Sequence, residues 1–340
     1  MEPTVSLVIV AQNEATRIER KLENVLALQY PRDLLEILLA SDGSTDDTVG
    51  RARTYEAAGI TLIAFKTHRG KPAVLNDVIP KARGEIVVLA DVRQRFEPGA
   101  LLAIVRPFAD PNVGAVSGEL CLTDDAGNTA AGEGIQFYWN YEKLIRKSES
   151  RVDSTVGATG AIYAIRRELF EPIPEDTLLD DVLIPIRITR RGFRVVFEPA
   201  ARAHDLAAKP AQEFTRKVRT IAGNFQLFAR ERWLLSPFRN RLWFQTLSHK
   251  GLRLLGPLFL AVAIASNFLL MNRPFYRWTF VAQIAFYAVA LIGYTARSGR
   301  NRNPFLGIPY IFCLLNWVTV VAFLRFLTGR QQVTWEKASP

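Results

Sequence analysis

The spacing of apolar residues changes several times in the first hundred positions. Residues 5–10 form an apolar, mostly β-branched run, which predicts a buried strand. Residues 15–28 carry apolar side chains at Ile18, Leu22 and Val25, the spacing of one helix face. The alternation continues, with strands expected at 35–40, 62–65 and 86–90 and helices at 46–58 and 74–81. Such alternation predicts an α/β domain with a parallel sheet and a ligand site at the carboxyl ends of its strands.

The last third of the chain has a different pattern. Residues 254–272, 278–296 and 303–324 contain no charged side chain, and an Arg stands at both ends of each stretch. About 20 apolar residues are needed for a helix to cross the hydrocarbon core of a bilayer. Buried helices of a soluble domain rarely run so long without a charge. The pattern therefore predicts about three transmembrane helices.

Charge is concentrated just before these stretches. The chain carries a net charge of +10, and residues 187–253 alone hold 15 Lys and Arg against four Asp and Glu. Aromatic residues are interleaved in this block, which favours an anionic lipid interface over nucleic acid as its partner. The two cysteines, Cys121 and Cys313, have neither metal-type nor disulfide-framework spacing, which favours a reducing compartment. Positive charge beside a membrane places the preceding residues in the cytoplasm.

Polar side chains follow three of the expected strands. Gln12-Asn13-Glu14 follows the first strand, a segment beginning at Asp42 follows the second, and Asp91 follows the fourth. Each alone is compatible with a turn or a helix cap, but three acidic strand ends at one sheet edge favour a site. Gly-rich dinucleotide and P-loop motifs are absent from the sequence. Acids around a phosphate ligand require a divalent cation or cationic side chains between them.

Six segments in order resemble glycosyltransferase family 2, the nucleotide-sugar transferases of GT-A fold. They are VIVAQNE, LLASDGSTDDT, HRGKPAVLN, VVLADVRQRFEPGAL, GATGAIYAIRR and LLDDVLIPIRITRRGFRV, and the resemblance covers residues 5–226. It is nearest to the membrane-embedded branch of cellulose, chitin and hyaluronan synthases and exopolysaccharide transferases. The fold implied is a Rossmann-like GT-A domain followed by interfacial helices and about three transmembrane helices. We expect a GT-A domain at 1–210, a basic amphipathic interfacial segment at 211–252, transmembrane helices at 253–327 and a tail at 328–340.

The resemblance implies a role for each matching residue at the donor. Glu14 and Asp42 are expected at the uridine of a UDP-sugar, with Asp42 accepting the uracil N–H. Lys71 is expected beside the base or the diphosphate, although a solvated lysine at a helix start fits the same pattern. Asp91 matches the first acid of the Asp-x-Asp metal motif, whose second acid is here Arg93.

A divalent cation, Mg²⁺ or Mn²⁺, is implied by the same motif. A lone carboxylate is a poor site for either ion. His204 stands where many GT-A enzymes have a metal-binding histidine, so Asp91 and His204 are the expected metal ligands. A structural surface histidine is the alternative for His204, and direct neutralisation of the diphosphate by Arg93 is the alternative to the metal.

The acceptor side of the site is implied by three further motifs. Asp181, after Asp180, matches the catalytic base of the family, and helix capping is compatible with that role. The segment Ala158-Thr159-Gly160 matches the acceptor floor. Residues 216–220 match the Gln-x-x-Arg-Trp motif, with Lys217 and Arg219 expected at the diphosphate. Thr220 replaces the Trp that stacks on the acceptor in polymerising relatives.

The resemblance implies an inverting transfer from a UDP-sugar to a lipid-linked saccharide or growing exopolysaccharide, on the cytoplasmic face of a bacterial-type inner membrane. A processive synthase and a non-catalytic membrane scaffold are the alternatives. Three spans from a cytoplasmic start place the tail outside, whereas Arg325, Arg330 and Lys337 favour the inside. A re-entrant third segment or a partner subunit that supplies a helix would resolve this conflict.

Overall fold

The computed structural model describes residues 2–123, 130–206, 210–295 and 304–331. The chain divides into two compact units. The first unit contains residues up to 123 and residues 146–206, and the second contains residues 124–145 and 207–331. Each unit is described separately below.

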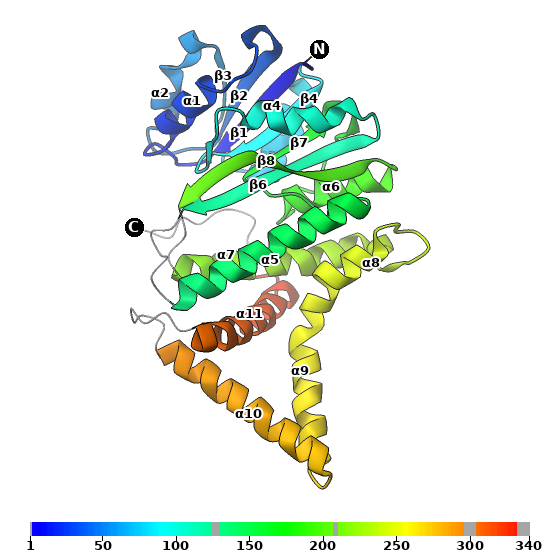
Figure 1. Ribbon diagram of the computed structural model, residues 1–340. Coiled ribbons are helices and arrows are strands. Elements are labelled where there is room, and N and C mark those ends of the chain that lie inside the picture. Colours follow the sequence, from blue (N-terminus) through cyan, green and yellow to red (C-terminus); the bar gives the residue numbers. More distant parts are fainter. Residues whose placement is uncertain (1, 124–129, 207–209, 296–303, 332–340) are drawn as a thin grey trace. The chain divides into compact units, whose positions relative to one another are not determined.

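A mixed eight-stranded sheet forms the centre of the first unit (Figure 1). Its strand order is β3-β2-β1-β4-β7-β6-β8-β5. The strands are β1 (Val5–Ala11), β2 (Leu35–Asp42), β3 (Ile60–Phe65), β4 (Ile86–Asp91), β5 (Arg95–Phe96), β6 (Val113–Thr123), β7 (Ile162–Arg166) and β8 (Arg194–Leu206). The first four strands in the order are parallel, as the sequence predicts.

The expected parallel sheet is found only in part, because the sheet is mixed beyond β4 and only β6 and β8 pair in parallel there. Strand β7 runs antiparallel to both β4 and β6, and β5 runs antiparallel to β8. Ile162 at the start of β7 pairs with Ala90 near the end of β4. Because β7 begins beside the carboxyl end of β4, it must run in the opposite direction. The loop before β7 therefore lies at the edge where the acidic strand ends are found.

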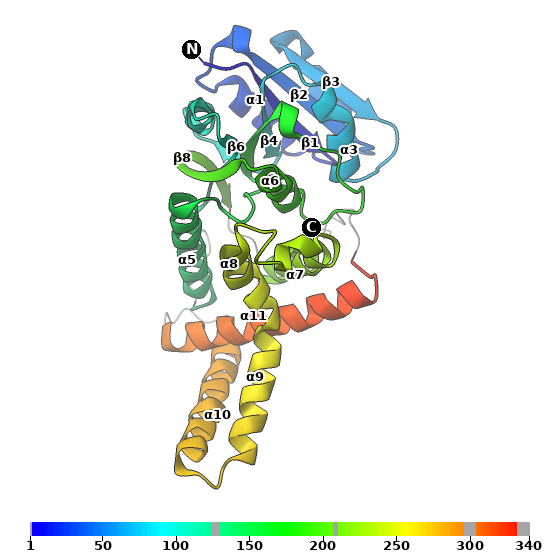
Figure 2. The same ribbon diagram turned by 90° about the vertical axis from the view of Figure 1, so that its right-hand side faces the viewer.

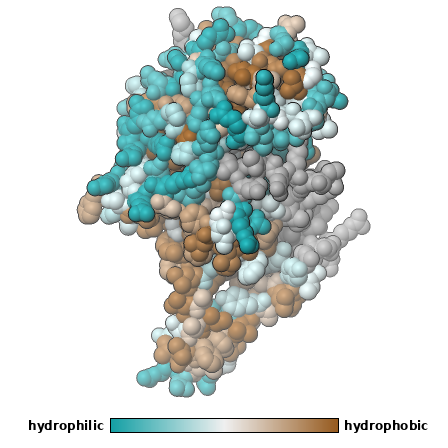
Figure 3. Space-filling model, turned by 180° about the vertical axis from the view of Figure 1, so that it is seen from behind, coloured by the Kyte–Doolittle hydropathy of each residue, from teal (hydrophilic) through white to brown (hydrophobic). Residues whose placement is uncertain are grey.

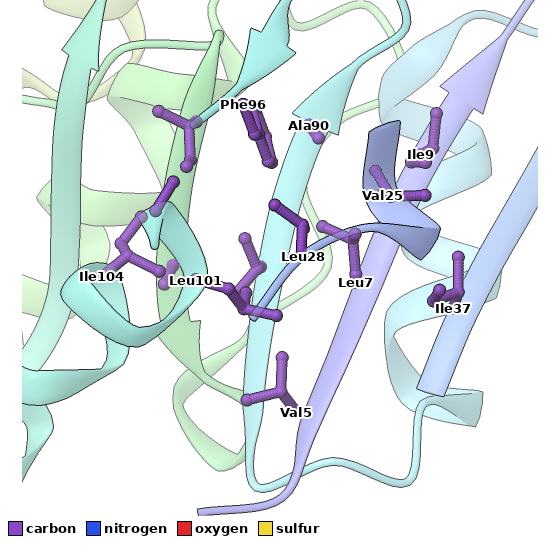
Figure 4. Packing of buried hydrophobic residues seen from close by; sticks show 14 of the residues in the cluster. Val5, Leu7, Ile9, Val25, Leu28, Ile37, Ala90, Phe96, Leu101 and Ile104 are labelled. Carbon is purple, nitrogen blue, oxygen red and sulfur yellow. The ribbon is translucent and has the colours of Figure 1, made fainter. Parts of the chain in front are cut away.

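Helices pack on the sheet and form a hydrophobic core with it. The helices of this unit are α1 (Ile18–Leu26), α2 (Thr48–Arg53), α3 (Lys71–Val78), α4 (Ala100–Val105) and α6 (Asp180–Arg190). The close-up in Figure 4 shows Val25 of α1 beside Leu7 and Ile9 of β1, with Leu101 and Ile104 of α4 on the other side of β4 in the same buried cluster. This apolar contact fixes the sheet, and so holds the strand ends that carry the polar residues.

The second unit contains the helices that the charge-free stretches predict. Three of its described helices are long and apolar enough to cross a membrane, at Trp243–Leu269, Pro274–Thr295 and Phe305–Leu327. Figure 2 shows α9 (Leu252–Leu269) and α10 (Pro274–Thr295) as a hairpin, with α11 (Pro304–Leu327) lying across it. Figure 3 shows apolar side chains covering the hairpin surface. Three helices of the length and composition that the sequence predicts are confirmed, and they mark the chain as a membrane protein.

The basic stretch before the hairpin is also helical. It contains α7 (Pro210–Arg230), the short α8 (Trp243–Gln245) and a π-helical turn at Thr246–Gly251. The centroid of the Phe225 ring on α7 lies 5.2 Å from that of Phe323 and 5.9 Å from that of Phe326, both on α11. Helix α5 (Ala130–Val152) contributes residues to both units.

Candidate active site

Two loops at the carboxyl ends of β1 and β2 are joined by hydrogen bonds. The Asn13 side-chain oxygen accepts the backbone N–H of Thr45 at 2.7 Å, and the Asn13 N–H donates to the Ser44 hydroxyl at 3.0 Å. Asn13 adopts a left-handed conformation with φ of 52°, which Asn tolerates better than most residues. The Glu14 N–H donates to the Thr48 hydroxyl, and the Glu14 carboxylate pairs with Arg17 at 3.1 Å. Glu14 is thus fixed at this edge of the sheet.

Asp42 holds the loop that leads into α3. Its Oδ1 accepts the Arg69 N–H at 2.8 Å, and its Oδ2 accepts the Gly70 N–H at 2.8 Å and contacts His68 Nδ1 at 2.7 Å. Gly70 has φ of 94°, a conformation that favours glycine. The Asp42 carboxylate is buried by these contacts. Asp42 therefore fixes where Lys71 begins its helix, and its contact with a uracil stays a prediction.

Lys71 joins two strand ends through one ammonium group. Its Nζ donates to Asp91 Oδ1 at 2.9 Å and lies 3.3 Å from Asp180 Oδ2. Burial alone would lower the pKa of Lys71, but the carboxylates of Asp180 and Asp91 raise it above its usual value. Burial alone would raise the pKa of Asp91, but Lys71 and Arg93 lower it. The site therefore contains a permanent cation between two carboxylates.

The acid pair at the start of α6 faces the loop before β7. The Tyr163 hydroxyl donates to Asp180 Oδ2 at 3.2 Å, while burial and the nearby acids raise the pKa of Tyr163 well above its usual value. A Cβ built on Gly160 would lie 3.1 Å from Asp181 Oδ2, so the Asp181 carboxylate lies against the bare backbone of Gly160. The Asp181 carbonyl accepts the Ala158 N–H at 2.8 Å, and the Thr159 N–H donates to Ser117 at 3.1 Å. The expected base and the expected acceptor floor are therefore neighbours.

Lys21 is a buried residue near Asp91 that sequence reasoning did not find. Its side chain is 2% exposed, and its ammonium donates to the Gln94 carbonyl at 2.8 Å and lies 3.8 Å from the centroid of the Phe96 ring. Burial lowers the pKa of Lys21 to about 7, against a smaller opposing effect of Asp91. A signal was present, because position 21 falls on the apolar face of α1 between Ile18 and Val25.

The residues expected to bind metal have other partners. His204 Nε2 lies 2.9 Å from Glu97 Oε1, and Arg93 Nε lies 2.8 Å from Asp205 Oδ2. Asp205 is buried and also accepts the Gln94 side-chain N–H at 3.0 Å. Within the described part of the chain, no group of three or more His, Cys, Asp and Glu could hold a metal ion. The Arg93–Asp205 ion pair was missed by sequence reasoning, since nothing in the sequence links positions 112 residues apart.

The two basic residues expected at the diphosphate lie on α7 in the second unit. Lys217 Nζ pairs with Glu213 Oε1 at 3.7 Å, one helical turn earlier. Arg219 is on the same helix, after the buried Val218. Their contact with a donor stays a prediction.

Comparisons with known proteins identify the family of this chain. The profile of the glycosyltransferase-like family 2 matches residues 3–233. A poly-beta-1,6-N-acetyl-D-glucosamine synthase of Staphylococcus aureus strain COL is 24% identical over 202 residues, which cover 58% of this chain and 48% of that protein. The probable glycosyltransferase YdaM of Bacillus subtilis strain 168 is 26% identical over 212 residues, 58% of this chain and 50% of that protein. The chain spans about half the length of these curated relatives.

A solved structure extends the likeness to nearly the whole chain. The mannosyltransferase PcManGT of Pyrobaculum calidifontis, described in complex with GDP-Man and Mn²⁺, matches with a TM-score of 0.75. The match covers 97% of this chain and 88% of that one at 24% identity, and it shows a shared fold. The family match over more than half of the chain, on a GT-A domain followed by apolar helices, shows that this protein belongs to glycosyltransferase-like family 2.

Proposed function

We propose that this protein is an inverting glycosyltransferase of the membrane surface. It transfers a sugar from a nucleoside diphosphate sugar to a lipid-linked saccharide or a growing exopolysaccharide. The observation that carries the proposal is the position of the Asp181 carboxylate against Gly160, next to the Lys71–Asp91–Asp180 ion network. A base, an open backbone floor and a buried cation at one sheet edge are the elements that such a transfer needs.

Asp181 acts as the general base. It takes the proton of an acceptor hydroxyl as that oxygen attacks the anomeric carbon. The new bond joins the acceptor oxygen to this carbon, and the bond from the carbon to the diphosphate oxygen breaks. A single in-line displacement inverts the configuration, so an α-linked donor gives a β-glycoside. Gly160 supports this role because its lack of a side chain leaves room for a sugar beside the carboxylate.

Lys71 and Asp180 support the departing group and the base, respectively. The leaving diphosphate gains negative charge, which a nearby ammonium stabilises most effectively where water is excluded. Asp180 is held by Lys71 and by the Tyr163 hydroxyl. Because these contacts fix the start of α6, they also fix the direction of the neighbouring Asp181.

The donor nucleoside is proposed as uridine, with Glu14 and Asp42 at the base. The solved relative is described with GDP-Man, so both UDP-sugars and GDP-sugars belong in the assay. Lys217 and Arg219 are proposed as further contacts of the diphosphate, as the family motif implies. These assignments rest on the resemblance.

The membrane helices support an acceptor that is itself held at a membrane. The catalytic unit and the basic stretch that ends at Arg253 are both proposed to lie on the cytoplasmic side of a bacterial-type inner membrane. A processive synthase is the second candidate, favoured by the polymer-forming relative. Thr220 in place of the acceptor-stacking Trp favours single additions. Product length separates the two, since a polymerase gives a ladder and a single-addition enzyme gives one added sugar.

Replacement of Asp181 tests the proposal directly. We expect Asp181→Asn to lower the rate of sugar transfer by roughly a thousandfold, because general-base catalysis contributes on the order of 10²–10⁴. Binding of UDP or GDP, measured by calorimetry on the purified full chain, should change little. Asp176→Asn is the matched control, since Asp176 is an exposed acid of the same segment. Equal transfer rates in wild type and Asp181→Asn would refute the assignment.

A further inference from the structure

The donor set around Asp91 does not fit a divalent cation. Mg²⁺ and Mn²⁺ prefer several oxygen ligands, usually from more than one carboxylate. Asp91 Oδ1 already accepts from Lys71 at 2.9 Å, and Asp180, the nearest other acid in this network, is paired with the same ammonium at 3.3 Å. A cationic side chain therefore stands where a metal would bridge these acids.

The second acid position of the Asp-x-Asp motif also holds a cationic side chain. Arg93 replaces an acid and pairs with Asp205 at 2.8 Å. Asp205 is buried, with 6% of its side chain exposed, so its charge is committed to Arg93 and Gln94. The acid that could join Asp91 in a metal site is thus neutralised by an arginine.

His204 does not complete a metal site either. It precedes Asp205 in β8, and successive residues of a strand point to opposite faces. Because Asp205 contacts Arg93, His204 faces the other side, where its ring contacts Glu97 at 2.9 Å. The predicted pair of Asp91 and His204 is therefore not assembled in the described residues.

We propose that Lys71 and Arg93 replace the divalent metal and that this protein binds and transfers its donor without one. The inference rests on the proposed function and deepens it. A donor diphosphate carries one negative charge on each phosphate, which the two side-chain cations match. An ammonium has three N–H donors, so pairing with Asp91 and Asp180 leaves one for a phosphate oxygen. Arg93 keeps 29% of its side chain exposed while its Nε is buried, so Asp205 does not cover the whole side chain.

The test measures binding of UDP and GDP to the purified full chain by calorimetry, in EDTA and in millimolar MnCl₂, together with sugar transfer under both conditions. We expect the wild type to bind its nucleotide in EDTA, with a Kd that Mn²⁺ changes by less than about threefold. Arg93→Ala should weaken binding in EDTA by roughly tenfold or more, the usual effect of losing a charge-assisted contact. Arg93→Asp places acids at both motif positions beside Asp205, so its nucleotide binding should become dependent on Mn²⁺.

Arg95→Asp is the matched control for Arg93→Asp. It makes the same charge change at an exposed position two residues away, and its binding should not become dependent on Mn²⁺. If the wild type binds nucleotide and transfers sugar only when Mn²⁺ is present, the inference is overturned while the proposed function stands. If neither nucleotide binds under any condition and no sugar is transferred, the proposed function fails and the inference fails with it.

Discussion

At Gly160 the backbone itself forms one wall of the candidate site. An added Cβ would lie 3.1 Å from Asp181 Oδ2, closer than most real Cβ contacts, so the carboxylate or the loop would have to shift. We expect Gly160→Ala to lower kcat/KM for the acceptor by roughly tenfold, because small displacements of a catalytic group cost rate steeply. Gly99→Ala is the control, since the nearest atom to its new Cβ is 3.9 Å away. Unchanged acceptor kinetics in Gly160→Ala would show that this space is not used.

Lys21 gives the first unit a pH-dependent stability. Its pKa falls from 10.5 in the unfolded chain to about 7 in the folded protein, chiefly because burial disfavours the charged form. Between these values the unfolded state binds more protons, so the free energy of unfolding rises with pH across this window. We expect the melting temperature of the wild type to rise from about pH 7 to about pH 9 relative to that of Lys21→Met.

A matched variant separates this effect from general charge loss. Lys81 is exposed, so Lys81→Met should keep the wild-type dependence of melting temperature on pH. The comparison uses the slope with pH, because Lys21→Met also loses the hydrogen bond to the Gln94 carbonyl. Parallel pH profiles for wild type and Lys21→Met would contradict the lowered pKa.

At the scale of elements, local patterns predicted the strands and helices whose formation depends on residues close in sequence. Strands expected at 5–10 and 35–40 are found at Val5–Ala11 and Leu35–Asp42, and the ends of α9, α10 and α11 lie within a few residues of the ends of the charge-free stretches. The antiparallel part of the sheet was not predicted, because the pairing of β4 with β7 joins segments far apart in sequence, such as Ala90 with Ile162, and no local period encodes it. The 23-residue helix α5 was also missed.

In the site as well, the residues were predictable from local pattern but their partners were not. Strand-end acids such as Asp42 and Asp91 follow from local pattern and family motif. Their partners do not, because the ion pair of Arg93 with Asp205 and the bond of His204 to Glu97 depend on how β8 is placed against β5. A motif identified the position of His204, but only the alternation of side chains along β8 shows that Asp205 faces the arginine.

The packing of α7 on α11 is the element contact that the sequence least reveals. The Phe225 ring contacts the rings of Phe323 and Phe326, with centroid distances of 5.2 and 5.9 Å. We expect Phe225→Ala to destabilise the second unit by about 2 kcal/mol, since it removes two ring contacts and part of a packed side chain. The measurement is thermal unfolding in detergent. Phe238→Ala is the control, because Phe238 is 97% exposed, and equal losses in both variants would argue against the packing role.

At the scale of the whole molecule, the membrane helices raise a question of sidedness. Three spans in series would leave the chain after α11 on the side opposite to the catalytic unit. Arg325 lies in the last turn of α11 and Arg330 follows the helix, and positive residues beside a membrane favour the cytoplasmic side. Within the second unit, α11 lies across the α9–α10 hairpin and packs along α7 (Figure 2). The positive charges predict that residue 328 lies on the same side of the membrane as the catalytic unit.

Labelling of single cysteines in sealed vesicles tests this prediction. In a chain with Cys121→Ser and Cys313→Ser, we expect Thr328→Cys to react with a membrane-impermeant maleimide under the same conditions as Glu56→Cys in the catalytic unit. Asn272→Cys, in the turn between α9 and α10, should react only from the opposite side. All three positions are exposed, so differences report sidedness rather than burial. If Thr328→Cys reacts together with Asn272→Cys, α11 crosses the membrane completely and the positive charges at its end do not set the topology.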